Sequence, residues 1–299
     1  MTRVAVLADI HGNMPAFEAV IADIAAQQVD EVLVGGDLVG RGPQGSRVIQ
    51  KIRELGWPSV RGNHEDYLLT FKRGEVPPDW LEAAEWSASR WMADDLSDDD
   101  VRYMEGLPFS LRSQSLAQIH LVHASPLSNN DGIGPWTSRS SIRQHFDSVD
   151  ESVLVCAHTH RPLHERFDNG HVINVGSVGL PFNQDRRAQY VVFDHDDGEV
   201  DFQFRQVEYD LEQILAIYDS SGFLDAGGVT ARLLILELEN AQPYLVPFLQ
   251  WSSTLGIPPV EDQVEVFQTF YDPNEPMQRF FERLEVLSGQ REIGWQSNG

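Results

Sequence analysis

The stretch that decides the fold lies at residues 4–13 and reads Val4-Ala5-Val6-Leu7-Ala8-Asp9-Ile10-His11-Gly12-Asn13. Its apolar first half predicts a buried strand in a sheet that is covered on both faces. Asp9 and His11 follow where the chain leaves the sheet. Because residues two apart in an extended stretch point the same way, their carboxylate and imidazole should face one spot. Asn13 is a candidate cap for a helix that begins at Pro15, so this stretch predicts chemistry at the carboxyl edge of an α/β sheet.

The same arrangement recurs further along the chain. A second short strand ends at Asp37, in a glycine-rich loop that Pro43 closes. A third strand, expected at residues 58–60, ends at Asn63 and His64. The resulting β-α-β-α-β order places polar, ligand-type side chains at each strand exit, where they can meet at one edge of the sheet.

The second half of this region contributes three more histidines. Strands expected at residues 116–122 and 153–156 end at His123 and at the pair His158 and His160. Further strands, in which hairpins are expected, lie at residues 163–167, 171–175, 189–194 and 200–207.

The side chains at these strand exits form one candidate site. They are Asp9, His11, Asp37, Asn63, His64, His123, His158 and His160. Oxygen and nitrogen donors without thiolate suit manganese, iron or zinc better than calcium. Two divalent ions about 3.5–4 Å apart need a bridging carboxylate, and Asp37 is the natural bridge as the lone acid of its loop. One ion would take Asp9, His11 and one histidine of the 158/160 pair, and the other would take Asn63, His123 and the remaining histidine.

The motifs that carry these residues resemble, in the same order, those of the calcineurin-like metallophosphoesterase superfamily, with the small prokaryotic phosphoesterases as the most similar clade. They are Asp9-Ile10-His11-Gly12-Asn13, Gly36-Asp37, Gly62-Asn63-His64-Glu65, His123-Ala124-Ser125 and His158-Thr159-His160. The resemblance implies an α/β fold, a four-layer αββα sandwich with a binuclear metal site at one sheet edge. Residues 1–221 are expected to form this domain and residues 222–299 a helical C-terminal extension.

The resemblance also implies roles for the site residues. The first ion would bind Asp9, His11, Asp37 and His160, and the second would bind Asp37, Asn63, His123 and His158. Manganese is the favoured metal. A metal-bridging hydroxide would attack phosphorus in phosphate mono- or diesters of small molecules. His64 resembles the proton donor to the leaving group, and Asn63 and Arg41 would contact the substrate.

Arg41 leaves an alternative open. Its loop, residues 36–42, resembles that of serine/threonine protein phosphatases and symmetrical dinucleoside tetraphosphatases, in which an arginine at this place grips phosphate. Those enzymes carry an aspartate where this chain has Gly40. A phosphoprotein or dinucleoside-polyphosphate phosphatase is therefore the second hypothesis, and a non-catalytic scaffold with this fold is the third.

The net charge and the composition limit the classes of molecule that the protein is expected to bind. Forty-six acidic and 22 basic residues give a net charge of −24, which disfavours binding to nucleic acid or to anionic membranes. The sequence shows no apolar run long enough to span a bilayer and no recognisable export leader. With Cys156 as the single cysteine, we expect a cytoplasmic protein whose partner is a small phosphorylated substrate.

Three further patterns receive interpretations. Ser97 followed by three aspartates, residues 98–100, predicts a helix start rather than a calcium loop. Ser125 and Ser177 lack the pattern of a serine nucleophile. Beyond Tyr209 the chain shows helical spacing without a cluster of ligand-type residues, and the extension is interpreted as a self-association surface, giving a homo-oligomer, or as a cover over the site.

Overall fold

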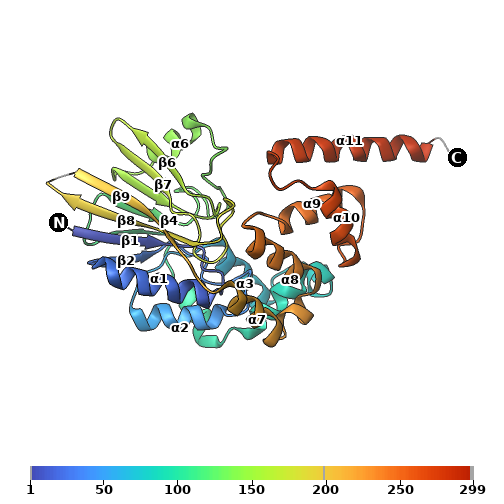
Figure 1. Ribbon diagram of the computed structural model, residues 1–299, viewed down its shortest axis with the longest axis horizontal. Helices are drawn as coiled ribbons and strands as arrows, with labels where there is room; N and C mark the ends of the chain where they lie inside the picture. Colours follow the sequence, from blue (N-terminus) through green and yellow to red (C-terminus); the bar gives the residue numbers. More distant parts are fainter. Residues whose placement is uncertain (1, 198, 297–299) are drawn as a thin grey trace.

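Two β-sheets lie at the centre of the computed structural model, which describes residues 2–197 and 199–296 (Figure 1). Within these residues the first sheet has the order β2-β1-β8-β9 and the second the order β3-β4-β5-β7-β6. The strands are β1 (Thr2–Leu7), β2 (Glu31–Val34), β3 (Ser110–Arg112), β4 (Ile119–Val122), β5 (Val153–Cys156), β6 (Leu163–Phe167), β7 (Gly170–Asn174), β8 (Ala188–Asp196) and β9 (Glu199–Val207).

Strand β1 explains why the two sheets stack. It lies between β2, with which it is parallel, and β8, with which it is antiparallel. Val4 and Val6 enter the core between the sheets, whereas Ala5 and Leu7 face the core beneath the helices. Because successive side chains of a strand point to opposite faces, the continuous apolar run fills two cores at once.

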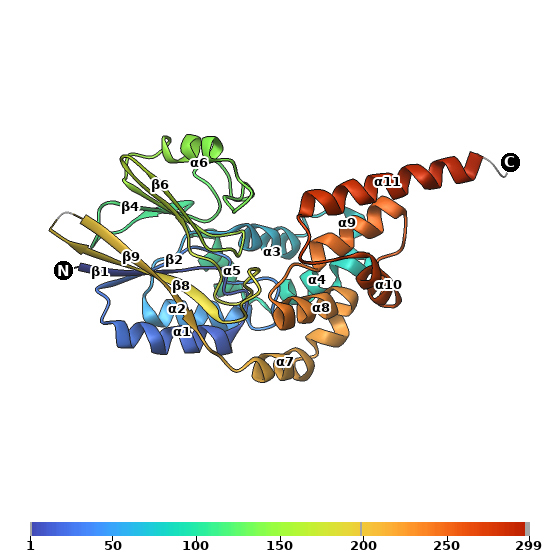
Figure 2. The ribbon, with the colours of Figure 1, turned by 45° about the horizontal axis from the view of Figure 1, so that its top comes forward.

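Helices cover both outer faces of this pair of sheets (Figure 2). Helices α1 (Met14–Gln27) and α2 (Gly45–Leu55) cover the first sheet, and α6 (Arg139–Phe146) packs on the second through a separate apolar cluster. The predicted four-layer αββα sandwich is therefore confirmed. Asn13 caps α1 as expected, since its side-chain oxygen accepts a hydrogen bond from the Ala16 N–H at 3.1 Å.

A helical segment connects the two halves of the sandwich. It contains α3 (Asn63–Arg73), the short 3₁₀ helices η1 (Pro78–Leu81) and η2 (Ala84–Trp86), α4 (Ser87–Asp95) and α5 (Asp98–Glu105). Ser97 caps α5, and Asp98 to Asp100 occupy its first turn, so the expected helix start is confirmed.

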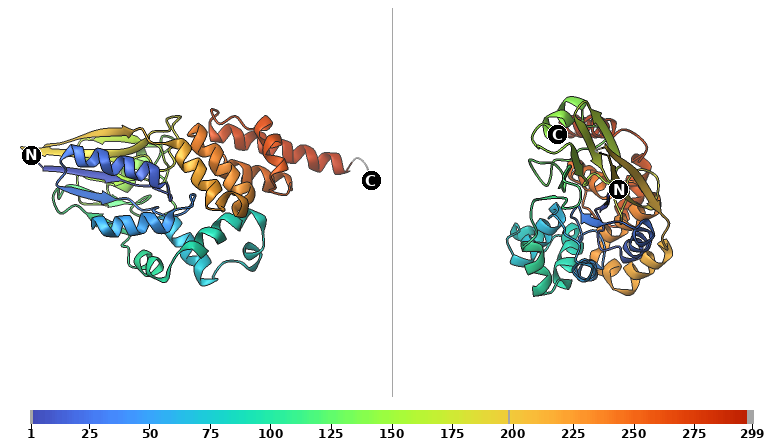
Figure 3. Two further views of the ribbon diagram at one scale, coloured as in Figure 1. Left: turned by 60° about the horizontal axis from the view of Figure 1, so that its bottom comes forward. Right: turned by 90° about the vertical axis from the view of Figure 1, so that its left-hand side faces the viewer.

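The C-terminal helices build a core of their own beside the sandwich (Figure 3). They are α8 (Phe223–Asn240), α9 (Leu245–Leu255), α10 (Asp262–Phe270) and α11 (Met277–Gln296), of which α11 projects away from the rest of the molecule. Helix α7 (Leu211–Ser220) packs instead into the core of the sandwich, through Ile214 and Tyr218. Helix α8 belongs to both parts: Leu234 and Leu238 pack into the core of the sandwich, whereas Val229 and Leu233 pack among the last helices. The division into residues 1–221 and 222–299 stays a prediction.

One expected strand differs from the structure, and two prolines shape the helices beyond Tyr209. The expected strand at residues 58–60 is wrong: among the described residues it forms one isolated bridge, Val34 with Ser59, because Pro58 has no N–H to donate to a ladder. Within the helical spacing expected beyond Tyr209, Pro273 separates α10 from α11. Helix α9 contains Pro247, which is tolerated there since it lies in the first turn.

Candidate metal centre

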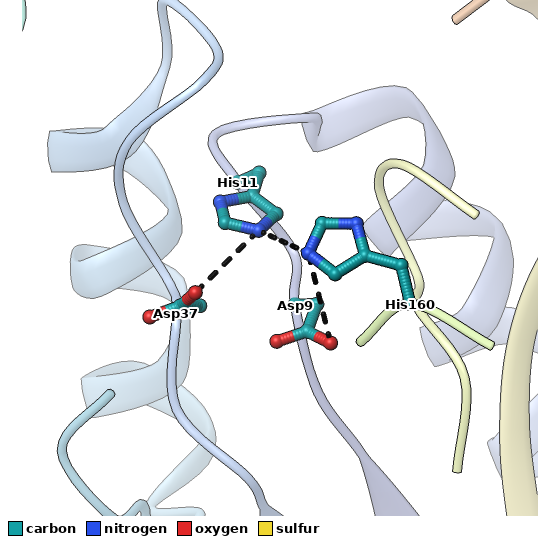
Figure 4. Close-up of side chains that lie close together, drawn as sticks. All are labelled: Asp9, His11, Asp37 and His160. Carbon is teal, nitrogen blue, oxygen red and sulfur yellow. Dashed lines mark hydrogen bonds and ion pairs between the residues drawn. The ribbon is translucent and has the colours of Figure 1, made fainter. Parts of the chain in front are cut away.

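The loops that follow β1, β2, β4 and β5 converge with the start of α3, and two groups of potential metal ligands result. Asp9, His11, Asp37 and His160 form the first group (Figure 4), and Asp37, His123 and His158 form the second. Asp37 belongs to both. Its Oδ2 lies 3.6 Å from His11 Nε2 and 3.4 Å from His123 Nε2. The residues selected from the sequence are thus brought together, with Asp37 at the shared position.

Asn63 completes the second group. Its side-chain oxygen lies 2.9 Å from both His123 Nε2 and His158 Nδ1. An amide oxygen is a neutral donor, so it adds a ligand atom without adding a further negative charge next to Asp37.

The backbone of the site adopts an uncommon conformation. Among the described residues other than glycine, ten have positive φ, and six of them are candidate site residues: Asp9, His11, Asp37, Arg41, His158 and His160. Left-handed backbone is unfavourable for residues with a Cβ and concentrates at functional sites. It also corrects the sequence argument, because Asp9 (φ 53°) and His11 (φ 51°) converge through a left-handed turn and not through an extended stretch.

Glycines and one buried acid hold the two main loops against each other. A Cβ on Gly62 would lie 2.1 Å from Asp37 Oδ1, so that position accepts no larger residue unless the carboxylate moves. Glu65 is fully buried and accepts hydrogen bonds from the N–H groups of Gly62, Asp37, Leu38 and Val39. Glu65 is not among the residues selected from the sequence. Its place three residues after the N-cap Gly62 is the capping-box position and was the available signal.

Backbone carbonyl groups orient three of the histidines. Nδ1 lies 3.1 Å from Val39 O in His11, 2.6 Å from Leu180 O in His160 and 2.8 Å from Gly35 O in His123. A carbonyl oxygen only accepts, so Nδ1 must carry the proton in each ring. The lone pair of Nε2 is then directed at the centre of the site, which is the usual arrangement of metal-binding histidines.

Two observations show that this donor set fits a cation. His11 Nε2 and His160 Nε2 lie 3.1 Å apart although neither carries a proton in the tautomers just assigned, so two lone pairs face each other. In addition, Asp9 Oδ1 is buried and has no hydrogen-bond partner among the described residues. A positive ion at this place would remove the repulsion between the two lone pairs and would give the unpaired carboxylate oxygen a partner.

Burial shifts the pKa values of the ligand carboxylates and imidazoles in the directions that favour their neutral forms. It raises the pKa of Asp37 to about 7 and raises that of Asp9, with the Asp37 carboxylate as the second cause for Asp9. Burial also lowers the pKa of His123 to about 4 and that of His158 to about 3. The carboxylates therefore resist ionisation in the metal-free protein, while the imidazoles remain available as neutral ligands.

We expect the metal-free protein to lose stability as the pH rises from about 7.5 to 9. Above about pH 7.5 the histidines are largely neutral in both states. The folded state still holds protons on Asp37 and Glu65, because burial raises their pKa values to about 7 and about 8, whereas the unfolded state has lost both protons. Because the folded state binds more protons, the free energy of unfolding falls as those protons leave. Thermal unfolding of EDTA-treated protein measures this. Asp37→Asn should make the fall in stability shallower, and a profile that is flat without the substitution would contradict the explanation.

His64 and Arg41 lie beside the first ligand group. The His64 ring packs edge-on against His11, with centroids 4.8 Å apart, and Arg41 Nε donates to His64 Nε2 at 3.3 Å. A Cβ on Gly40 would lie 2.2 Å from His64 Nδ1, so glycine is needed for the ring to occupy this place. Burial, with His11 and Arg41 as further causes, lowers the pKa of His64 well below its usual value.

The C-terminal helices reach this site, a contact that the sequence analysis missed. Glu237 of α8 is buried, and its Oε2 accepts a hydrogen bond from Arg41 Nη1 at 3.0 Å. Its Oε1 accepts from the N–H groups of Tyr244 and Leu245 at the start of α9, each at 2.8 Å. From α7, the Tyr218 hydroxyl donates to the carbonyl oxygen of Arg41. Arg41 is thus fixed by helices that lie at least 170 residues further along the chain.

Two more residues near the histidine pair had no role assigned. Asn174 is buried and donates to the carbonyl oxygens of Ala157 and Ile133, which holds the loop that carries His158 and His160. Arg161 follows His160 directly and is half-buried; burial lowers the pKa of its guanidinium.

Comparison with known proteins supports the same interpretation. A family model described as calcineurin-like phosphoesterase matches residues 2–162. The crystal structure of a metallophosphoesterase from Sphaerobacter thermophilus is similar, with a TM-score of 0.66 and 26% sequence identity, covering 80% of this chain and all of that one.

Two curated proteins are similar in sequence. An uncharacterized protein of Methanocaldococcus jannaschii is 26% identical over 228 residues, which cover 71% of this chain and 90% of that protein. A symmetrical bis(5'-nucleosyl)-tetraphosphatase of Nitrosococcus oceani is 31% identical over 121 residues, which cover 40% of this chain and 42% of that enzyme.

Proposed function

Because the chain belongs to the calcineurin-like phosphoesterase family, we propose that it is a binuclear metal-dependent phosphoesterase that hydrolyses phosphate mono- or diesters of small molecules. The observation that carries the proposal is the position of Asp37, whose Oδ2 lies within 3.6 Å of a histidine nitrogen from each ligand group. A carboxylate between two sets of donors is the arrangement that a pair of divalent ions requires.

The donor set determines which residues would hold each ion. Asp9, His11, Asp37 and His160 would hold the first, and Asp37, Asn63, His123 and His158 the second. Two such ions supply Lewis acidity, which activates water as a nucleophile and offsets charge on the phosphoryl oxygens. Manganese is the proposed metal, since nitrogen and oxygen donors without sulfur suit it.

Arg41 and His64 would act on the substrate itself. Arg41 presents a planar, permanently charged fork that binds two phosphoryl oxygens at once, and Glu237 keeps it in place. His64 would give a proton to the leaving oxygen. Its lowered pKa leaves it neutral in the free protein, so the bound phosphate must offset the charge of Arg41 before His64 can carry that proton.

The decisive experiment is hydrolysis by purified protein reconstituted with manganese, iron or zinc, with p-nitrophenyl phosphate and bis-p-nitrophenyl phosphate as substrates. Turnover of either ester that EDTA removes and the metal restores would support the proposal. Cleavage of neither ester by protein that demonstrably contains metal would refute it.

We expect His64→Asn to reduce kcat by about a hundredfold or more for esters with a poor leaving group, because general acid catalysis contributes about 10² to 10⁴. The loss should be much smaller for p-nitrophenyl phosphate, whose leaving group departs without protonation. Comparison of p-nitrophenyl phosphate with an alkyl phosphate measures this difference. Equal losses on both esters would show that His64 acts in another way, and His171→Asn, on an exposed hairpin, is the control.

A second candidate is a dinucleoside-polyphosphate phosphatase, favoured by the partial similarity to the tetraphosphatase and by Arg41. Full activity of Arg41→Ala towards all phosphorylated substrates would count against this candidate and against a phosphoprotein phosphatase. A non-catalytic scaffold would be supported by absence of bound metal after reconstitution.

The remaining proposals concern the cellular location, the binding partner and the oligomeric state of the protein. None of the helices in the described ranges is long and apolar enough to cross a membrane. A cytoplasmic location, a small phosphorylated partner and self-association through residues 222–299 are part of the proposal. The exposed apolar side chains of Phe281 and Val286 on the projecting α11 support self-association, which sedimentation analysis would test.

A further inference from the structure

Arg161 is a half-buried guanidinium group with an unusual environment. It lies over the ring of Trp136, 5.2 Å from the centroid, and 6.0 Å from the ring centroid of Phe182. In the described part of the chain it has neither a hydrogen-bond partner nor an ion-pair partner. The chain carries 46 acidic residues, so the lack of a carboxylate beside Arg161 is a local property and not a shortage of acids.

The absence of a partner has an energetic consequence. A guanidinium taken partly out of water loses hydration that a hydrogen bond or a counter-ion normally replaces. The contact with Trp136 offsets only part of that loss, since a cation over an exposed aromatic ring is weakly attracted by the ring's π electrons. All five N–H donors of the fork nevertheless remain without an acceptor from the described chain.

Arg161 lies close to the candidate metal centre. The ring of Phe182 stacks on His160, with centroids 4.6 Å apart and an angle of 18° between the planes. Arg41 lies 5.9 Å from the centroid of that same ring. Two guanidinium groups therefore border one aromatic ring next to a proposed metal ligand, but Glu237 neutralises Arg41, whereas Arg161 keeps its full charge for a ligand.

We propose that Arg161 forms a second anion subsite of the same active site, so that the substrate carries a second phosphate group beyond the scissile one, as a nucleoside diphosphate does. This inference rests on the proposed phosphoesterase function. The planar fork matches phosphate in a bidentate way, and the ring of Trp136, which is 63% exposed, offers a face on which a base stacks. In the reaction, the oxygen of water bonds to the scissile phosphorus and the water releases a proton, while the bond between that phosphorus and the bridging oxygen breaks. The inner phosphate leaves with the electron pair and takes up the proton that His64 supplies.

The experiment has two measurements on wild type, Arg161→Ala and Arg161→Lys, with Arg166→Ala as the control at an exposed arginine of β6. The first is binding of inorganic pyrophosphate to EDTA-treated protein by calorimetry at low salt. The second is the ratio of kcat/KM for adenosine diphosphate to that for p-nitrophenyl phosphate in the metal-loaded protein.

We expect Arg161→Ala to weaken pyrophosphate binding and to lower the kcat/KM ratio, each by about tenfold or more, because a hydrogen bond to a charged group is lost. Arg161→Lys should retain part of both, since it keeps the charge but not the fork. Arg166→Ala should match the wild type. Unchanged pyrophosphate binding and an unchanged ratio in Arg161→Ala would overturn the inference while leaving the phosphoesterase function intact. Arg161-dependent binding in a protein that hydrolyses neither substrate would instead refute the proposed function and keep the subsite.

Discussion

Asp37→Asn is expected to lower kcat by at least about a thousandfold and to leave the protein unable to retain two metal ions per chain, because metal ions contribute several kcal/mol of transition-state stabilisation. Asp37 is the shared member of the two ligand groups. Asparagine has the same shape, and its oxygen can still accept the hydrogen bond that the N–H of His64 donates to Asp37 Oδ1. What is removed is the negative charge between the two sets of histidine nitrogens.

Metal content after dialysis, measured by mass spectrometry, separates this effect from unfolding. Without metal, Asp37→Asn should unfold no more easily than the wild type above pH 7, because the substitution removes a carboxylate whose pKa burial raises to about 7. Asp168→Asn makes the same chemical change on an exposed hairpin turn and should retain full activity. Two bound ions and normal turnover in Asp37→Asn would remove the basis of the binuclear centre.

The site residues could be predicted from sequence because ligand chemistry is local. Asp9, Asp37 and His123 each follow an apolar strand, and strand exits are short enough to identify by pattern. The geometry behind the prediction was nevertheless different. The sequence suggested extended backbone from Asp9 to His11, but both residues adopt left-handed φ, a conformation that the surrounding contacts impose and that their residue types do not reveal.

The residues that support the site could not be found in this way, since their partners lie far away in the chain. Glu237 occupies a helical stretch and contacts Arg41, which is 196 positions earlier. Arg161 is half-buried and has no hydrogen-bond or ion-pair partner among the described residues. Both properties arise from tertiary packing, and a sequence without aligned relatives carries no local signal for them.

Glu237→Ala is expected to cost about 3–5 kcal/mol of stability, because removal of one partner leaves the other charge of a buried pair uncompensated. The guanidinium of Arg41 would lose its counter-ion. The N–H groups of Tyr244 and Leu245 would lose their acceptor at the start of α9 as well. Urea unfolding measures the loss. Glu239→Ala, on an exposed position of the same helix, is the matched control and should change little.

The KM of a Glu237 variant tests whether α8 only covers the metal centre or also positions a residue that binds the substrate. If α8 only covered the metal centre, Glu237→Gln, which keeps the acceptor oxygen but removes the charge, would leave KM unchanged. We expect KM for phosphate esters to rise instead, because an Arg41 without its counter-ion is no longer held beside His64. Metal content should stay at the wild-type level, since Glu237 belongs to neither ligand group. A higher KM with full metal content would mean that the C-terminal helices set the position of the phosphate-binding arginine, and that removing residues 222–299 disables the site and does not merely uncover it.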